Sequence, residues 1–174
     1  DAQVVMSPDA DLAGDFETAK SPTGMFLELR SRDGERSWPV SWRSKRQGST
    51  ATSTCEAEYT AMSTSARAEA IPMQIFLEAA LGRRVDLVCL EDNTQCLGAV
   101  KSGYSAALRS LPRTERISLS VAHETFMLTP GNEIRHSATS RRTDTRAATL
   151  RRGWSRPSSR LRSTCSGCEL TDYD

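Results

Sequence analysis

The chain has 174 residues, of which 37% are hydrophobic, and its formal net charge is +1. This length favours one domain with a core of its own, followed by a tail. The sequence has no apolar run long enough to span a membrane and no basic-then-apolar leader, so we expect neither a membrane protein nor a secreted one.

Two segments near the start of the chain predict strands. Val4-Val5-Met6 is a continuous apolar run within residues 2–6, which is typical of a strand buried on both faces, and it ends before Ser7-Pro8. Residues 23–31 have the composition of a second strand. Because the first strand begins almost at the first residue, we expect the chain to be a piece of a longer polyprotein.

A hairpin turn and a third strand follow. Asp33-Gly34 is a strong turn signal. Residues 38–44 then alternate in the manner of a strand. Pro39 lies within this segment and favours an edge position, because proline has no N–H to donate to a neighbouring strand. The short connections predict that the three strands form an antiparallel meander.

The hydrophobic period changes from that of a strand to that of a helix after residue 53. Ser53 and Glu56 form a capping box, with a hydroxyl at the helix start and a carboxylate three residues later. We expect a helix over about residues 54–81, kinked or split by Pro72 and ended by Gly82. Its apolar stripe consists of Cys55, Tyr59, Met62, Ala66 and Ala70.

The second half of the chain alternates between strands and helices. Apolar periodicity and turn residues predict strands at residues 85–90 and 133–136, and helices at residues 93–101, 114–128 and 143–150. Strands that are separated by helices, after an antiparallel meander, imply an α/β fold in which helices cover a mixed sheet.

Four acidic residues lie where apolar or patterned segments meet polar ones: Asp9, Glu58, Asp92 and Asp144. Asp9 and Asp92 end strands, and sites in open α/β sheets form beyond the carboxyl ends of strands. Glu58 and Asp144 lie near helix starts, so all four can converge. Clustered carboxylates repel one another unless a cation joins them, and oxygen ligands without spaced His or Cys indicate Mg²⁺ or Mn²⁺. The alternative is a set of ordinary solvated carboxylates.

Two other acids beside these positions have simpler explanations. The capping box accounts for Glu56. Adjacent strand residues point to opposite faces, so we expect Glu91 to face away from Asp92 if the strand continues.

The C-terminal part of the chain is basic. Residues 135–162 contain nine arginines and a single acid, Asp144. Residues 151–174 predict a basic, disordered tail, with attraction to nucleic acid as the alternative. Cys165 and Cys168 form a lone CxxC in this tail, and the two histidines are badly spaced to complete a zinc site. We therefore expect five reduced thiols without a metal or redox role.

Five motifs follow one another in a characteristic order over about residues 3–150. They occupy residues 7–15 with 20–24, residues 41–47 (Ser-Trp-Arg-Ser-Lys-Arg-Gln), residues 53–61 (Ser-Thr-Cys-Glu-Ala-Glu-Tyr-Thr-Ala), residues 92–96 and residues 143–148. In this order and spacing the chain resembles the ribonuclease H domain of copia-type retrotransposon polyproteins. The motifs at residues 41–47 and 53–61 are the most specific.

The resemblance implies a fold and a reaction. The fold would be ribonuclease H-like over residues 1–150, a five-stranded mixed sheet of three antiparallel and then two parallel strands flanked by helices. The enzyme would hydrolyse the RNA strand of RNA–DNA hybrids with two Mg²⁺ or Mn²⁺ ions. The family's metal-binding and catalytic acids correspond to Asp9, Glu58, Asp92 and Asp144, with Asp9 bridging both ions.

The resemblance also implies partners. Candidate contacts to the nucleic acid are Arg43, Lys45, Arg46, Arg141 and Arg142, and the alternative for these cations is surface solubility. His136 would assist product release or proton transfer, or be structural. A reverse transcriptase domain would precede this one in the polyprotein, in a cytoplasmic virus-like particle or in the nucleus.

The chain departs from the family's pattern at several positions. Pro8 precedes the first acid in a strand that is central to the fold, where proline is poorly tolerated. Leu12 replaces a common Trp, Pro72 interrupts the long helix, and Ala147-Ala148 replaces Thr-Lys. These departures leave an alternative function: a catalytically decayed ribonuclease H-like domain that acts as a nucleic-acid-binding or interaction module.

Overall fold

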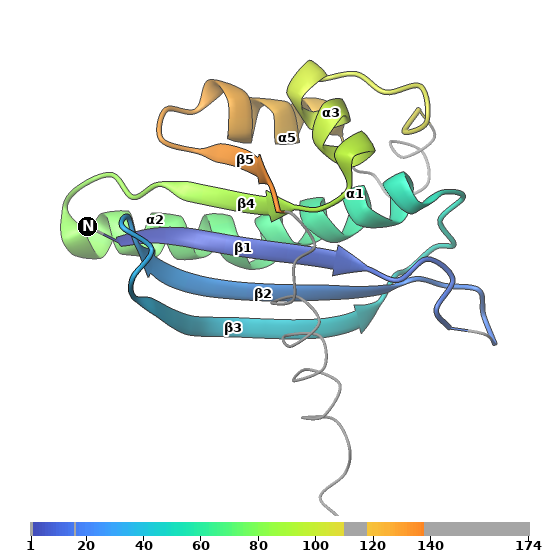
Figure 1. Ribbon diagram of the computed structural model, residues 1–174, viewed down its shortest axis with the longest axis horizontal. Coiled ribbons are helices and arrows are strands. Elements are labelled where there is room, and N and C mark those ends of the chain that lie inside the picture. Colours follow the sequence, from blue (N-terminus) through green and yellow to red (C-terminus); the bar gives the residue numbers. More distant parts are fainter. Residues whose placement is uncertain (1, 16, 110–117, 138–174) are drawn as a thin grey trace, which may run out of the picture. The chain divides into compact units, whose positions relative to one another are not determined.

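The computed structural model describes residues 2–15, 17–109 and 118–137, all within one compact unit of residues 1–140. Five strands form one mixed sheet in the order β3-β2-β1-β4-β5 (Figure 1). The β1–β2 and β2–β3 pairs are antiparallel, and the β1–β4 and β4–β5 pairs are parallel. This is the predicted α/β architecture of three antiparallel and then two parallel strands. The strands are β1 (Ala2–Ala10), β2 (Pro22–Ser31), β3 (Ser37–Arg46), β4 (Leu87–Glu91) and β5 (Glu133–His136).

Strand β1 accommodates Pro8 because its pairing with β4 ends before this residue. The Val4 N–H donates to the Asp86 carbonyl at 2.8 Å, so alternate residues of β1 direct their N–H groups toward β4. Pro8 belongs to this set, but the ladder with β4 ends at Met6. Beyond Met6, β1 pairs with β2 alone and extends to Ala10, four residues past the predicted end. The missing N–H of proline therefore leaves no gap in the ladder.

The predicted hairpin between β2 and β3 is confirmed. Gly34 has φ of 78°, a left-handed conformation that glycine adopts without steric cost. Strand β3 forms one edge of the sheet, which confirms the edge position that Pro39 favours. The register shifts between Leu27 and Glu28, opposite Pro39, so the edge also carries a bulge.

The predicted long helix is split into three parts: α1 (Thr54–Ser65), the π-helical turn η1 (Ala66–Ala70) and α2 (Ile71–Leu81). Ser53 caps α1 by accepting the Glu56 N–H at 3.2 Å. The Glu56 carboxylate accepts the Thr52 N–H at 2.7 Å, so the capping box reaches one residue further back than predicted. Pro72 lies in the first turn of α2, directly after η1, and Gly82 ends α2 with φ of 62°.

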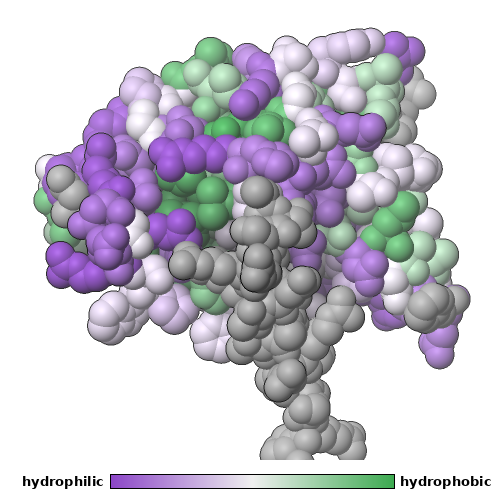
Figure 2. Space-filling model, in the orientation of Figure 1, coloured by the Kyte–Doolittle hydropathy of each residue, from purple (hydrophilic) through white to green (hydrophobic). Residues whose placement is uncertain are grey.

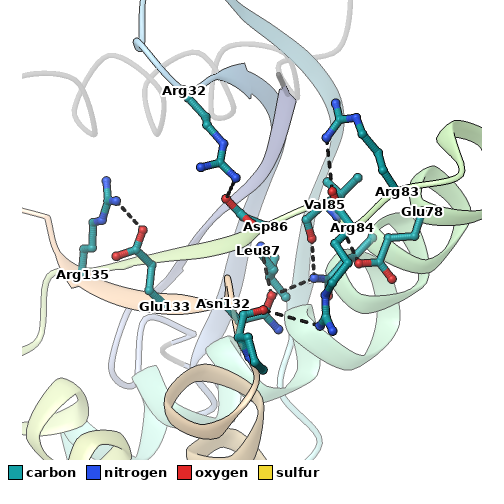
Figure 3. Close-up of polar contacts among 12 residues, drawn as sticks. Arg32, Glu78, Arg83, Arg84, Val85, Asp86, Leu87, Asn132, Glu133 and Arg135 are labelled. Atoms are coloured by element: carbon teal, nitrogen blue, oxygen red, sulfur yellow. Dashed lines mark hydrogen bonds and ion pairs between the residues drawn. The ribbon is translucent and has the colours of Figure 1, made fainter.

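The remaining described helices are α3 (Thr94–Ser102), α5 (Leu119–His123) and the π-helical turn η2 (Glu124–Leu128). The described part of the predicted helix at 114–128 therefore begins at Leu119. Polar contacts hold the amino end of β4 (Figure 3). The Asn132 side chain accepts the Leu87 N–H at 3.2 Å, and Arg32 pairs with Asp86 at 2.5 Å.

The main core lies between the sheet and the helices. Helices α1 and α2 lie behind the strands in Figure 1. Val4, Met6 and Leu87 pack with Tyr59 and Met62 in one buried cluster.

The other sheet face is the one that Figure 1 presents to the viewer. Because strand residues alternate, Val5 and Val88, which are paired in register, belong to this face. Figure 2 shows hydrophobic residues over the middle of β1 and β4, surrounded by hydrophilic ones.

Several predictions fall on residues outside the described part of the chain. These are the helix at residues 143–150, Asp144, Arg141, Arg142, the tail at residues 151–174, and the CxxC of Cys165 and Cys168. The domain boundary at residue 150 stays a prediction for the same reason. Among the described residues, no helix is long and apolar enough to cross a membrane.

Candidate metal centre

Three predicted acids are carried to one edge of the sheet. Strands β1 and β4 are parallel, so their carboxyl ends lie on the same side, where α1 also begins (Figure 1). Asp9 is the penultimate residue of β1, and Asp92 directly follows β4. Glu58 is in the early turns of α1. The site therefore draws on elements that are far apart in the sequence.

The tightest group of ligand atoms comes from Glu58, Glu91 and Asp92. Each residue offers one carboxylate oxygen, and these oxygens all lie within 4.8 Å of one another. Glu58 is 5% exposed and Glu91 is fully buried, whereas Asp92 is half-buried. Asp9 is exposed and lies outside this group, but its negative charge raises the pKa values of both glutamates.

The environment of Glu58 disfavours its charged form. Burial is the largest cause, followed by the charges of Glu91, Asp9 and Asp92, and together they raise the pKa of Glu58 to about 9. A hydrogen bond from the Ala10 backbone N–H acts in the opposite direction. Oε2 of Glu58 is buried and has no hydrogen-bond partner. Without a cation, this carboxyl is neutral at physiological pH.

Glu91 is a member of the group that sequence reasoning missed. The expectation that it faces away from Asp92 applies only if the strand continues, but β4 ends at Glu91, so strand alternation does not extend to the next residue. Along β4, Glu91 is on the same face as Leu87 and Cys89, toward the helices. An acid at an inward position of a buried strand was the signal that could have identified it.

The polar contacts of Glu91 satisfy only one of its two oxygens. Oε1 accepts the Asn93 N–H at 3.1 Å, and Oε2 is buried without a hydrogen-bond partner. Burial raises the pKa of Glu91 to about 7, and the charges of Asp92 and Asp9 add to the effect. Hydrogen bonds from Asn93 and the Cys96 thiol partly offset this rise.

The donor set fits a hard divalent cation. All ligand atoms in the group are carboxylate oxygens, and two buried oxygens, one each on Glu58 and Glu91, lack any donor. Mg²⁺ and Mn²⁺ accept such ligands. Three buried cysteines lie nearby, but burial raises the pKa values of the thiols of Cys55, Cys89 and Cys96, and a protonated thiol is a poor metal ligand.

The predicted basic residues of β3 line a hollow of about 270 Å³ at the β2–β3 side of the sheet. Arg43 pairs with Glu69 at 2.6 Å and Arg46 with Asp15 at 2.5 Å. Lys45 has no acidic partner among the described residues, so its charge is available to an anion. The hydroxyl-bearing residues of the hollow are Thr23, Thr60, Thr64 and Ser65.

His136 lies closer to the acids than its position in the sequence suggests. It is the last residue of β5 and is paired in register with Glu91 on β4. Its side chain is exposed, and its role in product release or proton transfer stays a prediction.

Comparison with known proteins identifies the fold. No family model and no curated protein sequence matches the chain. Among solved structures, LC11 RNase H1 in complex with an RNA/DNA hybrid superposes with a TM-score of 0.50 and 16% identity, over 85% of this chain and 93% of that one. The chain has the ribonuclease H fold. This agrees with the order and directions of its five strands.

Two further solved structures are similar to this chain. RNase H1 from the archaeon Halobacterium salinarum has 19% identity and a TM-score of 0.47, over 85% of this chain and 93% of that one. The foamy viral protease-reverse transcriptase in complex with an RNA/DNA hybrid has 11% identity and a TM-score of 0.44. That match covers 84% of this chain and 18% of the viral one.

Proposed function

We propose that this domain is a metal-dependent ribonuclease H that hydrolyses the RNA strand of RNA–DNA hybrids. The observation that carries the proposal is the group of carboxylate oxygens of Glu58, Glu91 and Asp92, which lie within 4.8 Å of one another at the carboxyl end of β4. Two of the three are acids that the sequence motifs select. The buried, unpartnered oxygens distinguish this group from solvated surface acids, because a cation would supply the partner that they lack.

The residues that would hold the cations are Asp9, Glu58 and Asp92, together with Asp144 from the part of the chain outside the described residues. When bound, two Mg²⁺ or Mn²⁺ ions supply charge stabilisation and an activated water for phosphodiester hydrolysis. Asp9 is exposed at the end of β1, so it is the described acid that a substrate phosphate can approach most directly. Burial of Glu58 keeps bulk water away from the inner side of the site.

The cations of β3 would position the nucleic-acid strand. Phosphate contacts orient a protein on nucleic acid without reading its sequence. Lys45 is the strongest candidate because no acidic side chain in the described part of the chain pairs with it. Arg43 and Arg46 would contribute only by exchanging their carboxylate partners for phosphates.

The wider context that we propose rests on the sequence motifs. The motifs at residues 41–47 and 53–61 support an origin in a copia-type retrotransposon polyprotein. A reverse transcriptase domain would then precede this one, and the complex would act in a cytoplasmic virus-like particle or in the nucleus.

A cleavage assay tests the proposal. The whole chain is incubated with a labelled RNA–DNA hybrid and Mn²⁺, and the RNA fragments are resolved by length. Wild type should cleave the RNA strand, and Asp92→Asn should reduce the rate by about 100-fold or more, because the loss of even a residue that only supports a metal ligand costs about 10- to 100-fold. Asp86→Asn, at the opposite end of β4, is the matched control and should cleave as wild type does.

Two results would count against the enzyme. An inactive wild type that still binds the hybrid would support the alternative, a decayed domain that binds nucleic acid. Equal cleavage by wild type and Asp92→Asn would place the activity outside the candidate metal centre.

A further inference from the structure

We propose that Glu91 is a cation ligand, so that the metal centre has a carboxylate in addition to the four acids that the motifs select. The inference rests on one part of the proposed function, which is the binding of a metal ion at the acids. It adds a residue that no sequence motif in this chain selects, and it concerns binding of the cation rather than the cleavage reaction.

The first argument is the position of the Glu91 carboxylate. One of its oxygens lies within 4.8 Å of oxygens from both Glu58 and Asp92. The Asn93 N–H occupies Oε1 at 3.1 Å and thereby fixes the orientation of the group. Oε2 remains buried and has no donor. A cation that Glu58 and Asp92 hold between them is therefore within reach of a carboxylate that is already oriented.

The second argument is a comparison with other buried glutamates of the chain. Glu28, at 2% exposure, forms an ion pair with Arg30, and Glu56, at 4%, accepts hydrogen bonds from Thr52. In contrast, Glu58 and Glu91 have neither a cationic partner among the described ion pairs nor a donor for Oε2. A buried carboxylate with a structural role would have such a partner, as Glu28 and Glu56 do. Among the described ion pairs, none supplies a positive charge to Glu58 or Glu91, and both carboxylates belong to the same group of ligand atoms.

The third argument is energetic. A buried carboxylate group without a partner costs the folded chain free energy, because it loses hydration that nothing in its surroundings replaces. Replacement of one such residue without a ligand role leaves metal affinity unchanged. Replacement of a ligand lowers the affinity and, at the same time, relieves this cost in the metal-free protein. The variant would thus lose metal affinity but gain stability without metal, so the two measurements together identify a ligand.

The experiment compares wild type with Glu91→Gln, an isosteric change that removes the charge and keeps an oxygen for the Asn93 N–H. Mn²⁺ alone is the probe. Calorimetry on the whole chain at neutral pH should show about 10-fold weaker Mn²⁺ binding for the variant. Thermal unfolding in EDTA should show a higher midpoint for the variant than for wild type, and a smaller rise of that midpoint when Mn²⁺ is added.

Two controls separate the ligand role from a general loss of charge. Asp86→Asn removes a carboxylate from the amino end of β4, where it pairs with Arg32 (Figure 3). Glu56→Gln removes a buried carboxylate from α1, two residues before Glu58. Both variants should bind Mn²⁺ as wild type does.

The outcomes are distinct from those of the cleavage assay. Wild-type Mn²⁺ affinity in Glu91→Gln would overturn the inference, even if the wild-type enzyme cleaves the hybrid. Weaker Mn²⁺ binding would support it, even if the wild type is inactive. Glu91→Asp is a second variant that keeps the charge but withdraws the carboxylate by one methylene, and Mn²⁺ affinity equal to that of wild type would also overturn the inference.

Discussion

The cations of β3 differ in what already neutralises them, and this difference predicts which one contacts nucleic acid. Arg43 and Arg46 are each paired with a carboxylate, whereas Lys45 has no such partner within residues 2–15, 17–109 and 118–137. Lys45 is in register with Thr23 of β2, and Thr23 is in register with Ala10 of β1. Two strand spacings therefore place Lys45 about 10 Å from Ala10, the residue after Asp9. A nucleic-acid strand with one phosphate at Asp9 would therefore place a neighbouring phosphate near Lys45.

We predict that Lys45→Gln weakens binding to an RNA–DNA hybrid and lowers the dependence of the affinity on salt by about one counterion. Fluorescence anisotropy over a range of salt concentrations, in EDTA to prevent cleavage, measures both quantities. Lys101→Gln, in the last turn of α3, removes the same charge from another element and serves as the control. If both variants lose affinity equally, the effect is one of net charge and Lys45 makes no specific contact.

At the scale of elements, the start of α1 decides where Glu58 is held. Ser53 accepts the Glu56 N–H at 3.2 Å and Glu56 accepts the Thr52 N–H at 2.7 Å, so backbone donors at this helix end are satisfied. These bonds fix the first turn of α1, directly before Glu58. The N-cap Ser53 is thus a local, sequence-encoded support of the helix that carries Glu58.

We predict that Ser53→Ala lowers the free energy of unfolding by about 1 kcal/mol, the usual cost of a lost N-cap. Urea unfolding followed by circular dichroism measures this change. Thr64→Ala is the control on the same helix. Its side chain is exposed, and alanine has the higher helix propensity, so stability should not fall. Equal destabilisation by both variants would show that the loss is not a capping effect.

The elements that the sequence predicts are those with local causes. Gly34 and Gly82 adopt positive φ where a turn and a helix end were expected, and Pro39 lies on the edge strand. Two features escaped prediction because they depend on pairing and packing. Strand β1 continues through Pro8 because it remains paired with β2 after its pairing with β4 ends. The π-helical turn at Ala66–Ala70 has no marker in its alanine-rich sequence.

The residues of the candidate site likewise divide into those that a local pattern predicts and one that depends on strand pairing. Motif spacing selected Glu58 and Asp92, which the structure brings together. It did not select Glu91, because strand alternation predicts the face of a residue only while the strand continues. Whether Asp92 still belongs to β4 depends on the pairing of β4 with β5, which ends at Glu91 and His136. That pairing joins segments more than forty residues apart, so no local pattern reveals it.

At the scale of the whole molecule, the carboxylates link the stability of the domain to pH. Strand β1, helix α1 and strand β4 each bring negative charge to one point, and folding is what brings these charges together. In the unfolded chain, Glu58 has an ordinary pKa near 4.5, whereas in the folded chain its pKa is about 9. The unfolded state therefore releases its proton more readily, so the free energy of unfolding falls as the pH rises from the lower value to the higher one, and the loss remains above it.

We predict that the metal-free domain loses stability as the pH rises from about 5 to about 9. Glu58 alone contributes up to about 1.4 kcal/mol per pH unit within this window, and its effect is constant below pH 4.5, where both states are protonated. Urea unfolding in EDTA at a series of pH values measures the slope. Glu58→Gln should flatten it, because the amide does not titrate.

Mn²⁺ should reverse this dependence if the cation binds at the acids. A cation that binds only the folded state stabilises it by RT ln(1 + [L]/Kd), and it binds ionised carboxylates, so the stabilisation should be larger at about pH 8 than at about pH 5. The same unfolding series with saturating Mn²⁺ measures the difference between the two conditions. Stabilisation by Mn²⁺ that is equal at both pH values, or equal in wild type and Glu58→Gln, would place the cation away from this group. The carboxylates would then oppose folding without compensation from the cation.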